Sequence, residues 1–408
     1  MKQKLIFLTA FFTAAFAFSA EYYVDASRTD DTGSATNWAT AKKTIQAAVD
    51  LATDGDTVWV TNGTYNVGGA KTPDHSLMNR VCITSAITVR SVNGREVTII
   101  EGVERVDGEN VFDSVRGVFM TNSCALIGFT VTGGQTYRVG NDALDVSGGG
   151  IFLTDGCVVS NCTIIDNAAL LDGGGVFLSH GGIVESCIIS RNKVKYRGGG
   201  ANLYFGGKLV GCTLKGNSAE RLGGGAYCRE DGVIDRCIFT DNTSDLHGGG
   251  VALYKGGRLS NSVLHGNKAV NYGGGVYLRE NGTIKNCTMV QNTSSVAGGG
   301  VCLKDGGTLY NSIVWGNRAP KGDDVYKKGS GMKVRYICCS DGDAGSKSTT
   351  KYPLFVDAEN GNFLLLAGSP CINAGRNAYT SVGVDLNGNP RISDELVDLG
   401  AYEFSGGR

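Results

Sequence analysis

Arg197, His247 and Tyr272 are the side chains of this sequence best suited to proton transfer and carboxylate binding. An imidazole exchanges a proton near neutral pH, and a guanidinium can hold a carboxylate through two parallel hydrogen bonds. A base beside cationic groups is what β-elimination next to a carboxylate requires, because the developing negative charge must be stabilised while the proton leaves. The three residues are far apart along the chain, so they form a catalytic set only if the fold stacks their segments.

Metal chemistry has little support in the sequence. There is no Cys-x-x-Cys motif, and no cysteine–histidine pair has the spacing of a zinc site. The segment 385–390 resembles a calcium loop, but its glycine and a distal glutamate are out of register. We therefore expect a structural turn there and no metal or other cofactor, with Ca²⁺ as a possible cofactor only if the protein is a lyase.

Phe152, Phe177, Tyr227 and Tyr277 form a candidate ligand-binding set, because they occupy the same position of a repeat. The residues on either side of each are mainly apolar and would face the core, so strand alternation places these rings outside. A rigid stripe of exposed rings can stack on the faces of sugars or on a partner protein. The competing interpretation is that the segment 135–147 or the C-terminal tail covers the stripe.

Both sets depend on a repeat of 25 residues, each unit beginning with Gly-Gly-Gly. The interval is constant from residue 148 to residue 322, without insertion or deletion. A fixed period of this length indicates a solenoid, a propeller or another array. The glycines fit turns, since glycine accepts backbone conformations that other residues avoid. The triplets are residues 148–150, 173–175, 198–200, 223–225, 248–250, 273–275 and 298–300.

The pattern within each unit selects among these architectures. Apolar residues stand at its fourth and sixth positions, as in Ile151 and Leu153, and at its twelfth and seventeenth, as in Val159 and Ile164. Short strands separated by bends give this spacing, whereas no unit has helical periodicity or the length of a propeller blade. The units predict an all-β fold, a parallel β-helix, in which each coil lies ~4.8 Å above the last and completes its neighbour's core.

An asparagine stands at the twentieth position of every unit. Stacked at the coil spacing, its amide can hydrogen-bond from coil to coil, as amide ladders do in cross-β stacks. Asparagine also tolerates the left-handed backbone of a sharp corner. We expect a structural ladder rather than a catalytic or glycan-binding set. Its members are Asn167, Asn192, Asn217, Asn242, Asn267, Asn292 and Asn317.

Cysteine dominates the fifteenth position of the units, and serine replaces it in two of them. The position therefore calls for a small, inward-facing, weakly polar side chain, and we interpret these cysteines as core filler rather than disulfide partners. Elsewhere, the adjacent Cys338 and Cys339 cannot easily bridge each other, but one of them could pair with Cys371.

The repeats divide the chain into four parts. Lys2 and Lys4 precede a short apolar run and small residues, which is typical of a cleaved secretory signal. Between Trp38 and Ala52, apolar residues recur at helical spacing, and a short helix there would cap the open end of the β-helix. The parts are a signal peptide at 1–20, a cap with irregular first coils at 21–117, regular coils at 118–322, and a C-terminal coil and tail at 323–408.

Composition restricts the partners of the protein. Its 408 residues carry 38 basic and 39 acidic side chains, and 41% are hydrophobic. The formal net charge of −1 is too close to zero for a nucleic-acid binder, and the apolar content is too high for a disordered chain. No stretch is long enough to cross a membrane comfortably. We expect an exported monomer without a transmembrane segment once the signal is removed.

Three groups of motifs resemble known families. The start, with Tyr-Tyr-Val-Asp at 22–25 and Gly-Thr-Tyr at 63–65, is similar to exported bacterial β-helix proteins of the pectin-lyase-like fold. The repeat, with its asparagine, spacer and glycine triplet, resembles the polymorphic outer membrane protein repeats of Chlamydia. The tail, with Ala-Gly-Ser-Pro at 367–370 and Val-Asp-Leu-Gly-Ala-Tyr-Glu-Phe at 397–404, resembles the choice-of-anchor Q domain.

The resemblance implies a right-handed β-helix that is secreted or held at the outer membrane of a bacterium, with no single activity attached. We hypothesise a non-catalytic scaffold or adhesive protein that binds a polysaccharide, a surface glycan or another surface protein. The unbroken repeat favours a scaffold, because a catalytic site usually interrupts such regularity. The alternative is an enzyme, a pectate-lyase-like lyase or a hydrolase acting on acidic polysaccharides, with Arg197, His247 and Tyr272 as its residues.

Overall fold

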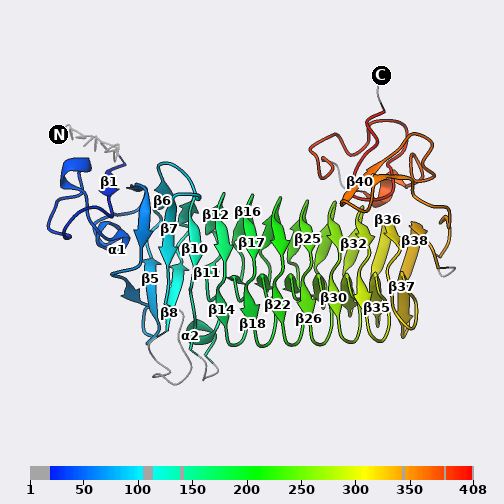
Figure 1. The fold of residues 1–408 in the computed structure, drawn as a ribbon, viewed down its shortest axis with the longest axis horizontal. Coiled ribbons are helices and arrows are strands. Elements are labelled where there is room, and N and C mark those ends of the chain that lie inside the picture. Colours follow the sequence, from blue (N-terminus) through cyan, green and yellow to red (C-terminus); the bar gives the residue numbers. More distant parts are fainter. Residues whose placement is uncertain (1–18, 104–113, 138–141, 342–344, 381–382, 407–408) are drawn as a thin grey trace, which may run out of the picture.

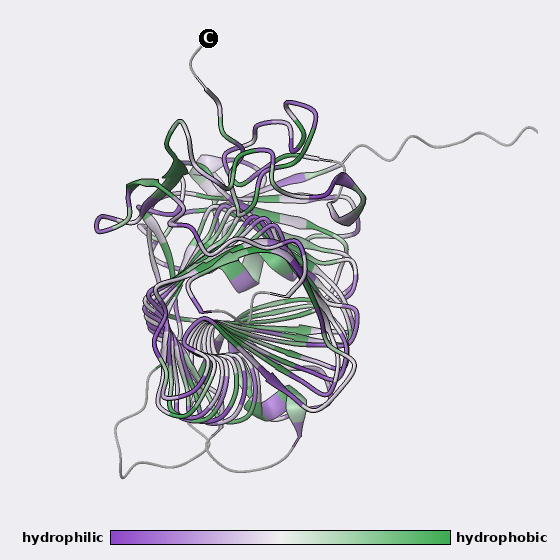
Figure 2. Ribbon diagram, turned by 90° about the vertical axis from the view of Figure 1, so that its right-hand side faces the viewer, coloured by the Kyte–Doolittle hydropathy of each residue, from purple (hydrophilic) through white to green (hydrophobic). Residues whose placement is uncertain are grey.

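The computed structural model describes residues 19–103, 114–137, 142–341, 345–380 and 383–406. Most of these residues wind into stacked coils that form a parallel β-helix (Figure 1). Viewed along the long axis, the coils superimpose on a common outline (Figure 2). The predicted all-β fold is confirmed. The predicted signal peptide lies outside the described residues, apart from Ser19 and Ala20.

Three sheets form the walls of the cylinder. Two of them run along most of the coils, and the other is confined to six of the described coils. In the described residues, the first has eleven strands and carries the fourth to seventh positions of the units. These are β4 (Ala70–Lys71), β5 (Met78–Ile83), β8 (Val115–Met120), β11 (Ile151–Thr154), β15 (Val176–Ser179), β19 (Ala201–Tyr204), β23 (Ala226–Arg229), β27 (Val251–Tyr254), β31 (Val276–Arg279), β35 (Val301–Lys304) and β37 (Val325–Lys328). The second sheet has six strands within that part of the chain: β14 (Ala168–Ala169), β18 (Lys193–Val194), β22 (Ser218–Ala219), β26 (Thr243–Ser244), β30 (Lys268–Ala269) and β34 (Thr293–Ser294).

The third sheet has 21 strands among the described residues and forms the opposite wall of the cylinder. Its strands are β1 (Glu21–Val24), β2 (Thr57–Val60), β3 (Gly63–Tyr65), β6 (Thr88–Ser91), β7 (Thr98–Glu101), β9 (Ala125–Ile127), β10 (Thr130–Thr132), β12 (Val158–Ser160), β13 (Thr163–Ile165), β16 (Ile183–Glu185), β17 (Ile188–Ser190), β20 (Lys208–Val210), β21 (Thr213–Lys215), β24 (Val233–Asp235), β25 (Ile238–Thr240), β28 (Arg258–Ser260), β29 (Val263–His265), β32 (Thr283–Lys285), β33 (Thr288–Val290), β36 (Thr308–Trp315) and β38 (Lys333–Cys339).

Successive units lie in register. Leu178 of β15 pairs with Leu203 of β19, and Leu203 pairs with Cys228 of β23, so each residue stands over the one 25 positions away. The inward positions are closed to solvent, with Val184 and Ile189 at 0% exposure. One continuous apolar core therefore runs through the coils, as the spacing predicts.

The asparagine ladder is confirmed. Nδ2 of Asn192 donates to Oδ1 of Asn217 at 3.0 Å and to the carbonyl of Ile164 at 2.9 Å. The ladder ends on Asp324, whose Oδ1 accepts from Nδ2 of Asn317 at 2.9 Å. The expected left-handed backbone, however, does not lie at the asparagine.

The residue before each ladder asparagine takes the left-handed conformation instead. Its φ is 52° at Arg191, 64° at Gly216 and 56° at Asp241. The asparagine has another task at this corner, since its amide bonds backbone groups that the bend leaves without strand partners.

All thirteen cysteines are buried thiols. In the fifteenth position, Sγ of Cys212 donates to the carbonyl of Val184 at 3.4 Å and packs in the main core. This arrangement agrees with the interpretation of the column as core filler. In the tail, Cys338 and Cys371 belong to the same apolar cluster, and Sγ of Cys338 donates to the carbonyl of Lys351 at 3.2 Å.

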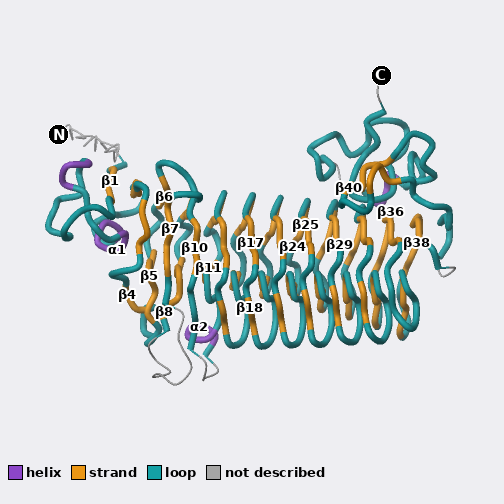
Figure 3. The backbone as a smooth tube through the Cα atoms, viewed as in Figure 1, coloured by secondary structure: helices purple, strands orange, loops and turns teal. Residues whose placement is uncertain are grey.

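A short helix covers the N-terminal end of the cylinder, as predicted. The 3₁₀ turn η1 (Trp38–Thr40) precedes α1 (Ile45–Val49), and Ile45 and Ala48 enter the main core (Figure 3). Oε1 of Gln46 accepts the backbone N–H of Cys82 at 2.7 Å, so the helix also satisfies a strand edge. A second helix, α2 (Ala143–Val146), lies beside the first regular coils. No helix in the described part of the chain is both long and apolar enough to span a membrane.

The tail folds back onto the outside of the last coils rather than closing the end of the cylinder (Figure 1). It contains β39 (Phe355–Asp357), β40 (Asn362–Leu365) and the 3₁₀ turn η2 (Asn377–Tyr379). Its second apolar core packs against outward side chains of β29, β33 and β36: Val263, Val290 and Ile313.

Candidate functional site

The aromatic stripe Phe152, Phe177, Tyr227 and Tyr277 points away from the core but is not exposed. These side chains are 2%, 2%, 2% and 4% exposed, respectively. The predicted exposure is therefore wrong, although strand alternation gives their direction correctly. The rings lie beneath other side chains of this surface, where a ligand cannot reach them.

Side chains of neighbouring positions cover the stripe. The alternative of a cover by segment 135–147 holds at one end, where Leu144 of α2 packs against the phenylalanines. Elsewhere the cause is lateral packing, because a wide ring in one column of a sheet fills the space over the next column. The side chains packed over the tyrosine half are Leu222, Tyr254, Tyr272 and Tyr326.

The structure brings two of the three candidate catalytic residues together. His247 and Tyr272 form a bridge between successive coils, and their ring centroids are 5.1 Å apart. The His247 ring also stacks on Tyr277 at 4.5 Å, with 27° between the planes. Arg197 lies two coils away, where it binds Asp172 through two bonds of 2.8 Å. Its guanidinium is therefore committed to a buried carboxylate and does not join the histidine.

Three cations that sequence reasoning missed surround His247. Arg279, Lys304 and Lys328 follow one another at the seventh position of successive coils, on β31, β35 and β37. Nζ of Lys328 lies 4.9 Å from the ring centroid of Tyr272 and 3.3 Å from its hydroxyl. The rings of Tyr272 and Tyr326 are stacked with 3° between their planes. We call the group His247, Tyr272, Arg279, Lys304, Tyr326 and Lys328 the cationic cluster.

The sequence did contain a signal for this cluster. From Tyr204 to Arg279 the seventh position alternates aromatic and basic residues one coil apart, which stacks a cation on a ring, and basic residues alone continue the column at Lys304 and Lys328. Arg279, for example, lies 5.2 Å from the ring centroid of Tyr254. The column reads Tyr204, Arg229, Tyr254, Arg279 and Lys304.

The cations of the cluster differ in whether a nearby carboxylate neutralises them. Arg279 pairs with Glu280 at 3.0 Å. Among the residues that the structure describes, no carboxylate lies within ion-pair distance of Lys304 or Lys328. The ammonium group of Lys328 lies over the ring of Tyr272, and Lys304 stands next to Lys328 in the strand register, one coil away.

The local field opposes a charged histidine. Burial, together with repulsion from Lys304, Arg279 and Lys328, lowers the pKa of His247 to about 4. The hydrogen bond to Tyr272 raises the pKa of Lys328. At neutral pH the imidazole is therefore neutral and weakly basic, while the ammonium keeps its proton. The cationic cluster is therefore better suited to binding anions and sugar faces than to removing a proton.

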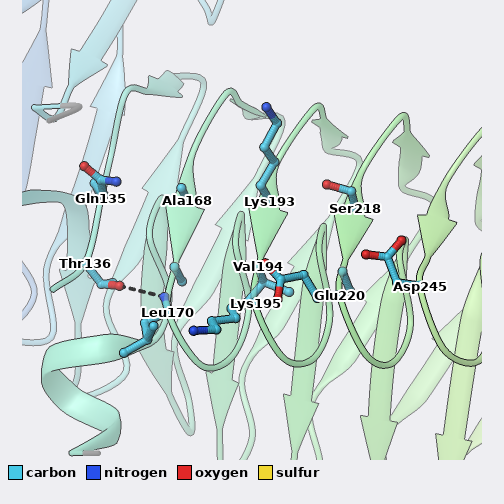
Figure 4. Close-up of a pocket in the computed structure, with 12 residues that line it drawn as sticks. Gln135, Thr136, Ala168, Leu170, Lys193, Val194, Lys195, Ser218, Glu220 and Asp245 are labelled. Carbon is cyan, nitrogen blue, oxygen red and sulfur yellow. Dashed lines mark hydrogen bonds between the residues drawn. The ribbon is translucent and has the colours of Figure 1, made fainter. Parts of the chain in front are cut away.

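A second surface, the groove over the six-stranded sheet, has a different character. Small side chains such as Ala169 and Ala219 line a cavity of about 510 Å³ (Figure 4). Lys193 and Lys195 face it together with Glu220 and Asp245, so both signs of charge are present. A further cavity of about 550 Å³ lies along the same sheet, at β30 and β34. The groove is wide enough for a ligand, but its walls do not select a charge.

A metal site requires several ligating side chains within reach of one ion. Within the described ranges, no three His, Cys, Asp or Glu side chains are placed to hold a metal ion together. Asp385, at the suspected calcium loop, accepts instead from the backbone N–H groups of Asn387 and Asn389, at 2.9 and 2.8 Å.

Comparison with known proteins identifies the class of fold. A family model described as a right-handed beta helix region matches residues 186–336. The structure of pectate lyase Pel9A has a TM-score of 0.55 and 16% identity, over 96% of this chain and 98% of its own. XylC in complex with xylose has a TM-score of 0.48 and 9% identity, over 94% of this chain and 99% of its own. No curated protein matches the chain. The protein is thus a right-handed parallel β-helix with the fold of pectate lyase, which confirms that part of the resemblance.

Proposed function

We propose that the protein binds an acidic polysaccharide on the outer face of the eleven-stranded sheet, at the cationic cluster. The observation that carries the proposal is the pair Lys304 and Lys328, neither of which has a carboxylate partner among the described residues, with Lys328 placed over the ring of Tyr272, which is parallel to that of Tyr326. Rings of this kind stack on sugar faces, and ammonium groups bind carboxylates or sulfates. A secreted or cell-surface location, where such polymers occur, belongs to the proposal.

The coil repeat supports an extended ligand over a single sugar. Arg279, Lys304 and Lys328 stand in a row along the axis, one per coil, at the ~4.8 Å spacing of neighbouring strands. A polymer that carries one acidic group per sugar presents charges in a row as well. Several weak contacts along one chain then add, because binding the first sugar raises the effective concentration of the next.

Catalysis is the second candidate function, favoured by the position of His247 inside the cluster and by the fold shared with pectate lyase Pel9A. Binding is favoured over it because the pKa of His247 is held near 4 and that of Lys328 is raised. Neither group is therefore an effective base at neutral pH.

Binding is tested by titrating the protein with polygalacturonate, alginate and neutral dextran at low and high salt. We expect the acidic polymers to bind, dextran not to bind, and the affinity to fall with salt. The double variant Lys304→Gln/Lys328→Gln should bind at least about tenfold more weakly, which corresponds to ~1.4 kcal/mol.

The matched control removes the same charge from the groove over the six-stranded sheet, with Lys193→Gln/Lys268→Gln. Both lysines are exposed and lie on a different face. Equal losses in the two double variants would show an effect of net charge alone and would overturn the proposal. Ultraviolet absorbance of unsaturated products, lost in His247→Phe, would establish the lyase instead.

A further inference from the structure

Cys124 and Cys157 lie side by side in neighbouring coils. The following residues, Ala125 of β9 and Val158 of β12, pair in register, so the two cysteines stand one above the other. Their sulfur atoms are 3.8 Å apart, and the side chains are 1% and 0% exposed. Each thiol thus meets the other in a closed apolar environment.

The position of this pair in the repeat sets it apart from the filler column. Cys157 is the tenth residue of its unit, and all the later units carry glycine there. A Cβ at Gly182 would come within 2.7 Å of Cδ1 of Leu153, which explains why the position is otherwise empty of side chains. The two coils before Gly182 both carry cysteine at this position, whereas the coil before them has Ile87. The later glycines are Gly182, Gly207, Gly232, Gly257, Gly282 and Gly307.

We propose that Cys124 and Cys157 form a disulfide bond, which fastens the irregular N-terminal coils to the regular array. Neighbouring parallel strands lie about 4.7–4.9 Å apart, and Cα atoms of disulfides are typically about 4.4–6.8 Å apart. The two backbones are therefore already at a bridging distance, and side-chain rotation brings the sulfur atoms together.

The chemistry requires a disulfide oxidant, such as oxidised glutathione. The thiolate of Cys157 attacks one sulfur of the oxidant, forms a mixed disulfide and releases one glutathione thiolate. The thiolate of Cys124 then displaces the second glutathione, so the oxidant gains two electrons and the two thiol protons go to solvent. Because both sulfurs are buried in the folded chain, the exchange occurs before the coils close.

The experiment folds the full chain in a glutathione redox buffer and, in parallel, in a thiol reductant. Free thiols are then alkylated with N-ethylmaleimide under denaturing conditions, and the chain is digested with trypsin. Peptide 117–138 contains Cys124 as its only cysteine, and peptide 139–191 contains Cys157, Cys162 and Cys187. We expect these two peptides to be linked after oxidative folding and separate after reduction.

Single variants identify the partner. The link should be lost in Cys157→Ser and retained in Cys162→Ser and Cys187→Ser, which are matched thiols on the same peptide. Full alkylation of Cys124 in the wild-type protein, folded in glutathione as judged by circular dichroism, would overturn the proposal. A link retained in Cys157→Ser would overturn it as well. Because the wild-type digest decides the first point, the test does not depend on any variant folding.

Discussion

Oδ1 of Asn217 accepts two hydrogen bonds from Asn192, one from the side-chain Nδ2 and one from the backbone N–H, each at 3.0 Å. One oxygen therefore joins two coils through both side chain and backbone. The same contact recurs in each following coil up to Asn292 and Asn317. The ladder is a chain of such oxygens, so the loss of one leaves donors on the coil before it unsatisfied.

Asn217→Ala should lower the free energy of unfolding by about 3 kcal/mol or more, because each buried polar group left without a partner costs about 1–3 kcal/mol. Denaturant unfolding followed by circular dichroism measures the change. The control is Asn93→Ala, at an exposed asparagine, which should change stability by no more than about 0.5 kcal/mol. Similar values for the two variants would contradict the role of the ladder.

Two arginine–aspartate pairs have similar geometry but different burial, so they show how burial changes the contribution of an ion pair to stability. Arg197 binds Asp172, whose side chain is 8% exposed, whereas Arg191 binds Asp166 on the surface, where the side chains are 62% and 46% exposed. Arg197→Met should cost about 1–3 kcal/mol, since it strands a buried carboxylate. Arg191→Met should cost less than ~1 kcal/mol, because water screens an exposed pair. Equal costs in a urea titration would refute this difference.

The first glycine of each triplet has a left-handed backbone, with a φ of 71° at Gly198, whereas the third is required by contact and not by backbone angle. A Cβ on Gly200 would approach the carbonyl oxygen of Gly225 to 2.6 Å. Gly200→Ala should therefore destabilise the protein by about 1–3 kcal/mol or prevent folding. Gly211 has a φ of 61° but open space around it. The equivalent residue two units later is Asn261, which also has a positive φ. Gly211→Asn should leave the thermal midpoint nearly unchanged, and a large drop there would show that the triplet is not special.

Acid should weaken the protein through His247. Its pKa falls from 6.5 to about 4 on folding, so the unfolded chain binds more protons between these values. The free energy of unfolding therefore decreases as pH falls from 6.5 towards 4. His247→Phe, which keeps a ring over Tyr277, should flatten the stability profile in this window. A profile identical to that of the wild type would mean that the histidine stays solvated.

The fold could be predicted from the sequence, because a constant period with fixed apolar positions admits few architectures. The cover of the aromatic stripe could not, since it depends on the width of side chains in other columns, such as Tyr254 and Tyr272. The place of the tail could not be predicted either. The tail covers the outward apolar residues Val290 and Ile313, but earlier coils carry apolar residues such as Ile188 and Ile238 in the same outward positions, so the pattern alone does not say which coils are covered.

The candidate site was recovered in part for a related reason. His247 and Tyr272 share a column, so the constant period predicted that they meet. Lys304 and Lys328 belong to another column, and β37 lies beyond the last glycine triplet, where the period no longer holds. Contacts between columns depend on side-chain reach around the coil, which the linear pattern does not record.

The uniform coil length has a consequence for the history of this molecule. Every strand and ladder contact between residues 148 and 322 joins positions one unit apart, and equivalent positions have similar side chains. Removing or duplicating one whole unit by recombination would bring matching edges together again, with no new loop to accommodate. The rod can thus lengthen or shorten in whole steps during evolution while both of its ends remain unchanged.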